Sequence, residues 1–390
     1  MTTAPLPPHF IEALAELDDP RSRSCPFPLD ELMFAALCGV SSGADSWVSV
    51  TDWAELQIDW LRQHLPYANG IASHDTFGRV FSLLDPHQFE RFFVRWMQHL
   101  CPALTGELIA IDGKSLRGSH DGGTRMTHLV SAWHHARGLV LGQVKTAAKS
   151  NEITAIPELV AALQVQGAIL TLDAMGCQHA VVDAIVAKPA DYIIAVKNNQ
   201  PTLAQAIEGL FEANDRGELE QALPQVTVVD KGHGRIETRQ CVVAHDVSAL
   251  GEVAAQWRGL RSVGRIRSTR EIVNGRAKGE GATEWRYYIS STQLSPERFE
   301  AAVRAHWGIE NQCHWVLDMT FSEDDCRIRV GDGAENFAIL RRLSLNLLRQ
   351  EKSRKTSLNI KRQKAAGARS IWRPCSASAR SRGSGFMQSP

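Results

Sequence analysis

Two short apolar runs, each followed by an acidic residue, restrict the fold of this chain more than any other feature. Residues 109–112 read Ile-Ala-Ile-Asp and residues 170–173 read Leu-Thr-Leu-Asp. Short apolar runs of this kind predict buried strands, and side chains at the carboxyl ends of neighbouring strands meet at one place in an open sheet. We therefore expect Asp112 and Asp173 to lie together in an α/β sheet. Each could instead be a turn or N-cap residue that follows its strand.

The pattern around these runs alternates between strands and helices. Strands are expected over residues 107–112, 126–134, 138–146, 167–173 and 191–197. Helices are expected over residues 152–165, 178–187 and 202–211. The first three strands should form a meander, and the later strands have intervening helices. This order predicts an α/β core with a mixed sheet.

Residues 1–100 read as a mostly helical domain. A helix is expected over residues 29–40, and a second over residues 46–65 carries Trp47, Trp53 and Trp60 about two turns apart. That spacing favours core packing over a base-stacking surface. Residues 73–76 suit the N-cap of a third helix, and Pro86 begins a fourth. Such a domain could bind DNA or mediate dimerisation.

The second half of the chain divides into three parts. Residues 216–292 contain alternating segments separated by glycine and polar residues, which predict a β-rich insertion. Helices are expected over residues 296–315 and 336–350, so the α/β core comprises residues 101–215 and 293–350. Residues 351–390 form a basic C-terminal segment. From residue 367 it becomes rich in Ser, Arg and Gly, and we expect disorder there.

Charge is unevenly distributed although the net charge is zero. Residues 341–390 hold 13 lysines and arginines and a single acid, Glu351. A basic end on an acidic body indicates a polyanionic partner such as nucleic acid, or else a solvated basic tail.

Other classes of protein are disfavoured by composition. No apolar run approaches the roughly 18–20 residues that cross a bilayer, and the first thirty residues lack the pattern of a signal peptide. We expect a cytoplasmic protein with no membrane partner. The eight cysteines are scattered without a C-x-x-C pair, so reduced thiols are expected rather than a zinc site or a disulfide framework.

A third candidate acid lies in the helix expected over residues 296–315. His306, Glu310 and His314 are four residues apart and should share a helix face. Together with two strand-end acids, Glu310 could complete an oxygen-rich site for Mg²⁺ or Mn²⁺. Two such ions about 3.5–4 Å apart can activate the attacking oxygen and stabilise the leaving oxygen at a phosphodiester. The His-Glu-His column is also a zinc candidate, although strand-end acids favour a harder cation.

The residues that follow Asp112 place positive charge beside it. Gly113 is expected in a tight turn, and Lys114 and Arg117 could keep the acid ionised or contact a DNA phosphate. The spacing is not that of a phosphate-binding P-loop.

These motifs together resemble a known family. The three core segments read D-G-K-S-L-R-G-S from residue 112, T-L-D-A-M-G-C-Q from residue 171, and H-W-G-I-E-N-Q-C-H-W-V-L-D-M from residue 306. The N-terminal segments read D-D-P-R-S, G-A-D-S-W and S-H-D-T-F-G-R-V-F. Over about residues 10–365 the chain resembles the DDE transposases of bacterial insertion sequences, specifically the H-repeat-associated group.

This resemblance implies a fold, an activity and a set of partners. The fold would be ribonuclease-H-like (integrase-type), with a β-rich insertion and a helical N-terminal domain. Asp112, Asp173 and Glu310 would hold two Mg²⁺ (or Mn²⁺) ions. The enzyme would cut double-stranded DNA at the ends of the element and join those ends to target DNA, as a homodimer in the DNA complex, associated with the nucleoid. We expect DNA contacts from seven residues: Lys114, Arg117, Lys197, Arg235, His306, Asn311 and His314.

Two alternatives and two departures accompany this interpretation. The alternatives are a nuclease of the same fold that cuts without joining, and a catalytically dead DNA-binding remnant. The wider class carries a Y-x2-R-x3-E-x6-K signature, and this chain has Val303, His306, Glu310 and Leu317 at those positions. His306 could replace the arginine as a donor to phosphate. The Ser/Arg/Gly-rich sequence after Ala366 departs from the ordered end of relatives and resembles a shifted reading frame.

Overall fold

The computed structural model describes residues 14, 17–23, 25–102, 104–120, 126–146, 152–232, 234–272, 279–352 and 355–367. The chain divides into two compact units. The first comprises Met1–His99 with Met319–Pro390, and the second comprises Leu100–Asp318. The sequence analysis placed residues 319–350 with the α/β core, whereas here they group with the N-terminal helices. The disorder expected from residue 367 concerns residues 368–390, which lie outside the described residues.

The first unit is built from helices. They are α2 (Leu29–Ser41), α3 (Trp47–Leu56), α4 (Ile58–Leu61), α5 (His74–Leu83), most of α6 (Pro86–Leu100), α13 (Gly333–Gln350) and α14 (Leu358–Gly367). The helix expected over residues 46–65 is interrupted at Gln57, which separates α3 from α4. The Ser73 side chain caps α5 by accepting a hydrogen bond from the backbone N–H of Thr76, as expected.

Aromatic packing holds α13 against the N-terminal helices of this unit. Helix α13 contacts α2 and α5. The Trp47 ring stacks on Phe81 with a centroid distance of 4.6 Å and meets Phe337 of α13 edge-on at 4.8 Å. Trp47 and Trp60 are both buried. These two tryptophans therefore belong to the core, as their spacing predicted, whereas Trp53 is half-buried.

The second unit contains a nine-stranded mixed sheet with the order β3-β2-β1-β4-β5-β9-β8-β7-β6. The first five strands are β1 (Leu108–Leu116), β2 (Thr127–His134), β3 (Leu139–Lys145), β4 (Ile169–Leu172) and β5 (Asp191–Val196). The other four are β6 (Gln225–Gly232), β7 (Arg235–Ala244), β8 (Ser262–Ile272) and β9 (Gly279–Ser290).

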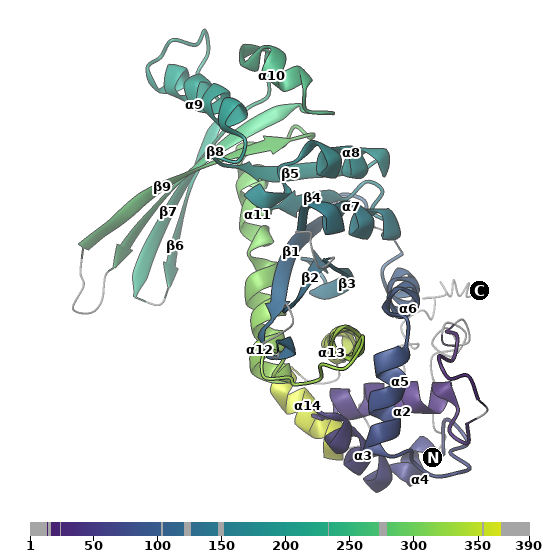
Figure 1. The fold of residues 1–390 in the computed structure, drawn as a ribbon. Coiled ribbons are helices and arrows are strands. Elements are labelled where there is room, and N and C mark those ends of the chain that lie inside the picture. The colour runs from purple at the N-terminus through teal and green to yellow at the C-terminus, as the bar shows by residue number, and fades with distance from the viewer. Residues whose placement is uncertain are drawn as a thin grey trace, which may run out of the picture. The chain divides into compact units, whose positions relative to one another are not determined.

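Strand pairing confirms the expected mixed sheet. Strands β1, β2 and β3 form an antiparallel meander, and β4 and β5 run parallel to β1. Strand β9 pairs antiparallel with β5. Residues 225–290 thus contain four strands, as the alternating segments predicted, and these strands continue the central sheet. Strands β6 to β9 project together beyond the others (Figure 1).

Helices cover both faces of this sheet. The unit contains α7 (Glu152–Ala162), α8 (His179–Ala187), α9 (Pro201–Asp215), α10 (Glu252–Ala255), α11 (Pro296–His306) and the start of α12 (Trp315–Phe321). Helix α7 contacts β2 and β3, and α11 contacts β1, β4, β6 and β7. The β1 backbone places successive residues on opposite faces, and α7 and α11 contact opposite faces, as the contacts described below show.

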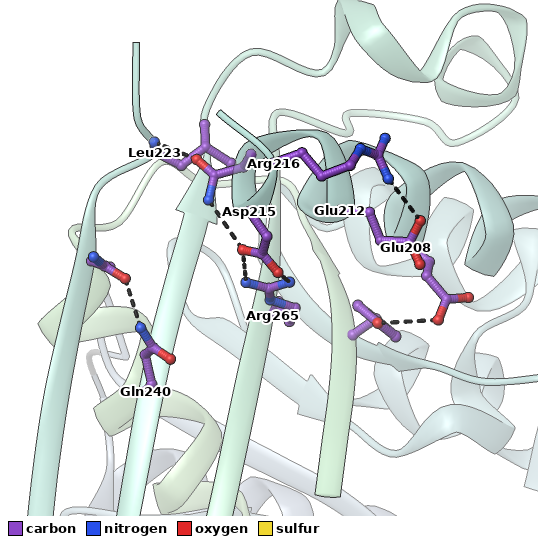
Figure 2. A network of polar contacts seen from close by, with 10 residues as sticks. Glu208, Glu212, Asp215, Arg216, Leu223, Gln240 and Arg265 are labelled. Carbon is purple, nitrogen blue, oxygen red and sulfur yellow. Dashed lines mark hydrogen bonds and ion pairs between the residues drawn. The ribbon is translucent and has the colours of Figure 1, made fainter. Parts of the chain in front are cut away.

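Helix α9 is tied to the projecting strands by one arginine. Arg265 of β8 donates two hydrogen bonds to the Asp215 carboxylate, of 2.6 Å and 2.7 Å (Figure 2). Its guanidinium also lies over the rings of Phe211 and Trp285, 5.0 Å and 4.6 Å from their centroids. A bidentate, aromatic-stacked arginine fixes orientation as well as charge. The projecting strands are therefore held on the side of α9 by a defined contact.

Two expectations about composition can be compared with the described part of the chain. Seven of the eight cysteines lie there, and each is a free thiol. Within these residues, no helix has the length and apolar character needed to cross a membrane.

Candidate active site

Asp112 and Asp173 lie on adjacent strands, as the sequence predicted. Strands β1 and β4 pair in parallel, with Ile111 opposite Leu172. Asp112 is the next residue of β1, and Asp173 directly follows the last residue of β4. However, β1 does not stop at Asp112, because residues 113–116 continue to pair with β2. Gly113 is therefore a strand residue and not the tight turn that was expected.

Asp173 directly follows β4 and caps the short 3₁₀ helix that comes next (Ala174–Gly176). Its Oδ1 atom accepts hydrogen bonds from the backbone N–H groups of Met175, at 2.9 Å, and Gly176, at 3.3 Å. The capping role considered for this residue is thus real. Both bonds use Oδ1, so the cap fixes the carboxylate plane without involving Oδ2.

Asp112 carries an unusually high pKa. Burial is the main cause and, with the other contributions, gives a pKa of about 7. The negative charges of Glu152, Asp173 and Glu310 act in the same direction, and a hydrogen bond from the Gly113 backbone opposes them. His314 lies 3.6 Å away, from Nδ1 to Asp112 Oδ2. The region around Asp112 therefore accumulates negative charge that a cation would neutralise.

Glu310 lies on a π-helical turn and not on a continuous α-helix. Helix α11 ends at His306, a π-helix spans Ile309–His314, and α12 begins at Trp315. The sequence analysis assumed one α-helix, in which residues four apart share a face. A π-turn widens the helix locally, and such turns are frequent at functional sites. Here it leaves Glu310 exposed between two anchored histidines.

The two histidines contact different strands. A hydrogen bond of 3.0 Å joins His306 Nδ1 to Thr171 Oγ1 on β4, whereas His314 approaches Asp112 on β1. Burial lowers the pKa of His306, and the nearby charge of Asp173 opposes that shift. The helical segment therefore contacts both strands, β4 through His306 and β1 through His314, and Glu310 lies between these two histidines in the sequence.

One cavity of about 260 Å³ brings the three acids together. Its polar lining combines Asp112, Asp173 and Glu310 with three cations or potential cations, Lys197, Arg286 and His306. Thr171, Tyr288, Trp307 and several apolar residues complete the wall. The Arg286 guanidinium lies 5.2 Å from the centroid of the Trp307 ring. Acidic, basic and aromatic side chains thus line a single cavity.

The sequence analysis missed the contribution of the insertion to this cavity. Arg286 and Tyr288 lie on β9, which pairs with β5 only after a long excursion of the chain. No local motif marks them. The sequence could have indicated these two residues only if it had shown that β9 pairs with β5 in the central sheet.

The other predicted DNA-contacting residues do not line the cavity. Lys114 is buried and forms an ion pair of 2.7 Å with Asp318. Arg117 is exposed in the short 3₁₀ helix Arg117–Ser119. Arg235 begins β7 and lies 3.3 Å from Glu237, and the exposed Asn311 donates a hydrogen bond to the carbonyl oxygen of Trp307.

The donor set suits a hard divalent cation. The three acids supply only oxygen atoms, and their mutual repulsion at Asp112 is the kind that such a cation relieves. Among the described residues, no three His, Cys, Asp or Glu side chains converge closely enough to hold one ion as they stand. Glu310, one of the three acids, is exposed and lies on the π-turn.

Comparisons with known proteins agree with this geometry. Residues 104–347 match the transposase DDE domain family, and residues 11–97 match the DDE_Tnp_1-associated family. The chain is 39% identical over 340 residues to the H repeat-associated protein YhhI of Escherichia coli K12, covering 87% of this chain and 89% of YhhI. It is 41% identical over 340 residues to YncI of Escherichia coli O157:H7, covering 87% and 86%. Both relatives carry the word transposase in their names.

A solved structure gives a much weaker similarity. The piggyBac transposase synaptic complex with hairpin DNA matches with a TM-score of 0.36 and 10% identity, covering 92% of this chain and 75% of that chain.

Proposed function

This chain belongs to the DDE transposases, in the H repeat-associated group, and we propose that Asp112, Asp173 and Glu310 hold the two divalent ions with which it acts on DNA. The enzyme functions in DNA transposition, cleaving DNA and transferring strands. One observation carries the assignment of residues: these three acids, distant in sequence, line one cavity. The family is generally dependent on divalent metals, and Mg²⁺ or Mn²⁺ fits an all-oxygen donor set.

The topology supports a ribonuclease-H-like assignment for the catalytic part. Three antiparallel strands are followed by two parallel ones, with helices on both faces. The strands of the insertion then extend this sheet from β5. We assign β1 to β5 with α7, α8 and α11 to the ribonuclease-H-like core and β6 to β9 to the insertion.

Bound divalent ions would supply an activated attacking oxygen and a stabilised leaving oxygen. The side chains of the protein would hold and position these ions. Asp112 and Asp173 come from adjacent strands and set the fixed side of the site, because the Asp173 carboxylate is already oriented by its cap. Glu310 would complete the site from the π-turn.

The basic wall of the cavity suits a DNA phosphate. Lys197 and Arg286 would neutralise the phosphodiester, and His306 would present Nε2 because its Nδ1 is bonded to Thr171. This assigns His306 the donor role suggested by its position in the family signature. Double-stranded DNA is the partner, both as transposon end and as target, and the acting species is proposed to be a homodimer on that DNA.

The reaction consists of two phosphoryl transfers. In the first, water attacks the phosphodiester at the end of the element and releases a 3′-hydroxyl. In the second, that hydroxyl attacks a target phosphodiester, forming one P–O bond while another breaks and leaving a new 3′-hydroxyl on the target. Both transfers need the same in-line geometry and charge stabilisation, so one site can perform both.

A strand-transfer assay tests this function. The purified chain is incubated with duplexes that carry the DNA flanking its own gene, a supercoiled target plasmid and Mg²⁺. Joined products are expected, and they should disappear in Asp112→Asn, Asp173→Asn and Glu310→Gln. Cleavage without joining would instead favour the nuclease alternative. DNA binding without either reaction would favour a catalytically dead remnant.

A further inference from the structure

A chain of three polar side chains lies beside Asp112, on residues that the proposed mechanism does not use. Ser115 Oγ and His128 Nδ1 are 2.8 Å apart, and His128 Nε2 and Glu152 Oε1 are 2.7 Å apart. Ser115 and His128 are opposite each other in the pairing of β1 with β2, and Glu152 is the first residue of α7. Each of the three is largely shielded from solvent. A neutral His128 satisfies both contacts by accepting from Ser115 and donating to Glu152.

The Glu152 carboxylate occupies the space that a side chain at position 113 would need. A Cβ atom built on Gly113 would lie 2.1 Å from Glu152 Oε1 and 2.5 Å from His128 Nε2. Gly113 directly follows Asp112 on β1. The glycine is therefore required for close approach of a carboxylate to the β1 backbone and not for a turn.

Glu152 and the Asp112 side chain lie on opposite faces of β1. Gly113 and Ser115 share the face covered by α7, whereas Asp112 and Lys114 face α11 and the segment after it. Glu152 is thus behind Asp112, separated from it by the strand backbone. Its negative charge nevertheless raises the pKa of Asp112, as do the charges of Asp173 and Glu310.

We propose that Glu152 is a positioning residue of the metal site, held by His128 and Ser115 against Gly113 so that its charge strengthens divalent-cation binding at Asp112. This proposal rests on the proposed function of Asp112 as a metal ligand. Outer-shell partners of ligands orient them and raise their affinity for metal. Here the partner acts across a glycine, through a carboxylate that faces the back of the strand.

Removing the charge of Glu152 should weaken cation binding without unfolding the protein. Glu152→Gln retains the shape of the side chain and an oxygen that can accept from His128. Mn²⁺ alone is titrated into the full-length chain, with and without a DNA duplex, and free Mn²⁺ is followed by electron paramagnetic resonance. The dissociation constant is expected to rise about 10- to 100-fold. Glu158→Gln, which neutralises an exposed residue of the same helix, should leave it unchanged.

A substitution of Gly113 tests the role of the Glu152 carboxylate in a second way, by displacing it. Gly113→Ala should displace Glu152 and raise the dissociation constant in the same direction. The double variant Gly113→Ala, Glu152→Gln should bind Mn²⁺ no more weakly than Gly113→Ala alone, because both changes act through one group. If Gly113→Ala does not fold, Glu152→Gln and its control still decide the question.

DNA binding without metal separates this role from a purely structural one. In EDTA the uncompensated acids repel phosphate, so Glu152→Gln should bind a duplex at least as tightly as the wild type and melt at the same temperature. A purely structural role of Glu152 would instead predict weaker DNA binding and a lower melting temperature in Glu152→Gln. Asp112→Asn provides the reference in the Mn²⁺ titration. If Asp112→Asn loses binding while Glu152→Gln matches the wild type, the role of Glu152 is overturned. If the wild type shows no specific site, or if Asp112→Asn binds Mn²⁺ as tightly as the wild type, the proposed function of these acids fails, and the role of Glu152 with it.

Discussion

Lys114 and Asp318 form an ion pair of 2.7 Å between Nζ and Oδ1, two residues along β1 from Asp112. The pair joins β1 to α12, the helix that continues directly from the π-turn bearing Glu310. The sequence suggested that Lys114 contacts DNA. Its burial indicates that it sets the spacing between the strand and the helix that carry two of the three acids.

Lys114→Ala should destabilise the protein because it leaves the Asp318 carboxylate in a partly buried position without this partner. The expected loss in the free energy of unfolding is about 3 kcal/mol, measured by urea denaturation. Arg117→Ala, at an exposed site on the same segment, should change stability by no more than about 0.5 kcal/mol. Wild-type stability of Lys114→Ala combined with weaker DNA binding would instead support the contact suggested by the sequence.

Asp112→Asn is expected to abolish Mg²⁺-dependent cleavage while leaving DNA affinity intact. Affinity depends mainly on cations that meet phosphate, and the amide leaves these in place. Cleavage and binding are measured on the same duplex, by gel and by fluorescence anisotropy. An active Asp112→Asn enzyme would remove this residue from the site. Simultaneous loss of both properties would indicate misfolding, which circular dichroism would detect.

The stability of the metal-free protein should depend on pH through Asp112. Its pKa in the folded state is about 7, above the ordinary value of 3.8, so the folded chain holds an extra proton between these values. Stability is therefore greatest in the acid part of this window and falls as pH rises through it, by at most about 1.4 kcal/mol per pH unit. Melting curves in EDTA from pH 5 to pH 8 should show this fall in the wild type. Asp112→Asn should reduce the slope, and an unchanged slope would refute the assignment.

Arg286→Ala should weaken DNA binding in a manner that depends on salt. Loss of one phosphate contact is expected to lower the slope of log affinity against log salt by about one. Arg216→Ala is a suitable control because Arg216 is exposed at the C-cap of α9 and pairs with Glu212 and Glu218. Equal effects of the two substitutions would mean that Arg286 contributes only general charge.

Local sequence patterns predicted the strands and helices near the site. They did not predict the features that depend on contacts between residues distant in sequence. The strands before Asp112 and Asp173 follow from apolar runs in the sequence, and their parallel pairing brings the acids together as expected. A spacing of four residues around Glu310 fits both an α-helix and a π-turn. The sequence therefore predicted which residues gather there but not the widened turn that presents Glu310.

Burial by distant residues accounts for the remaining differences. Lys114 reads as a surface cation until Asp318 is known to approach it. Gly113 reads as a turn residue until the Glu152 carboxylate is seen against its Cα atom. In both positions a partner remote in sequence decides the role, and no local propensity encodes that partner.

The pairing of β9 with β5 has a consequence for attempts to isolate a minimal enzyme. Without residues 225–290, the outer edge of β5 would present unsatisfied backbone N–H and C=O groups to solvent. Exposed edges of this kind recruit strands from other molecules. A shortened protein that keeps all three acids should therefore self-associate, and trimming the chain to a smaller soluble nuclease would need a redesigned, charged or proline-capped β5.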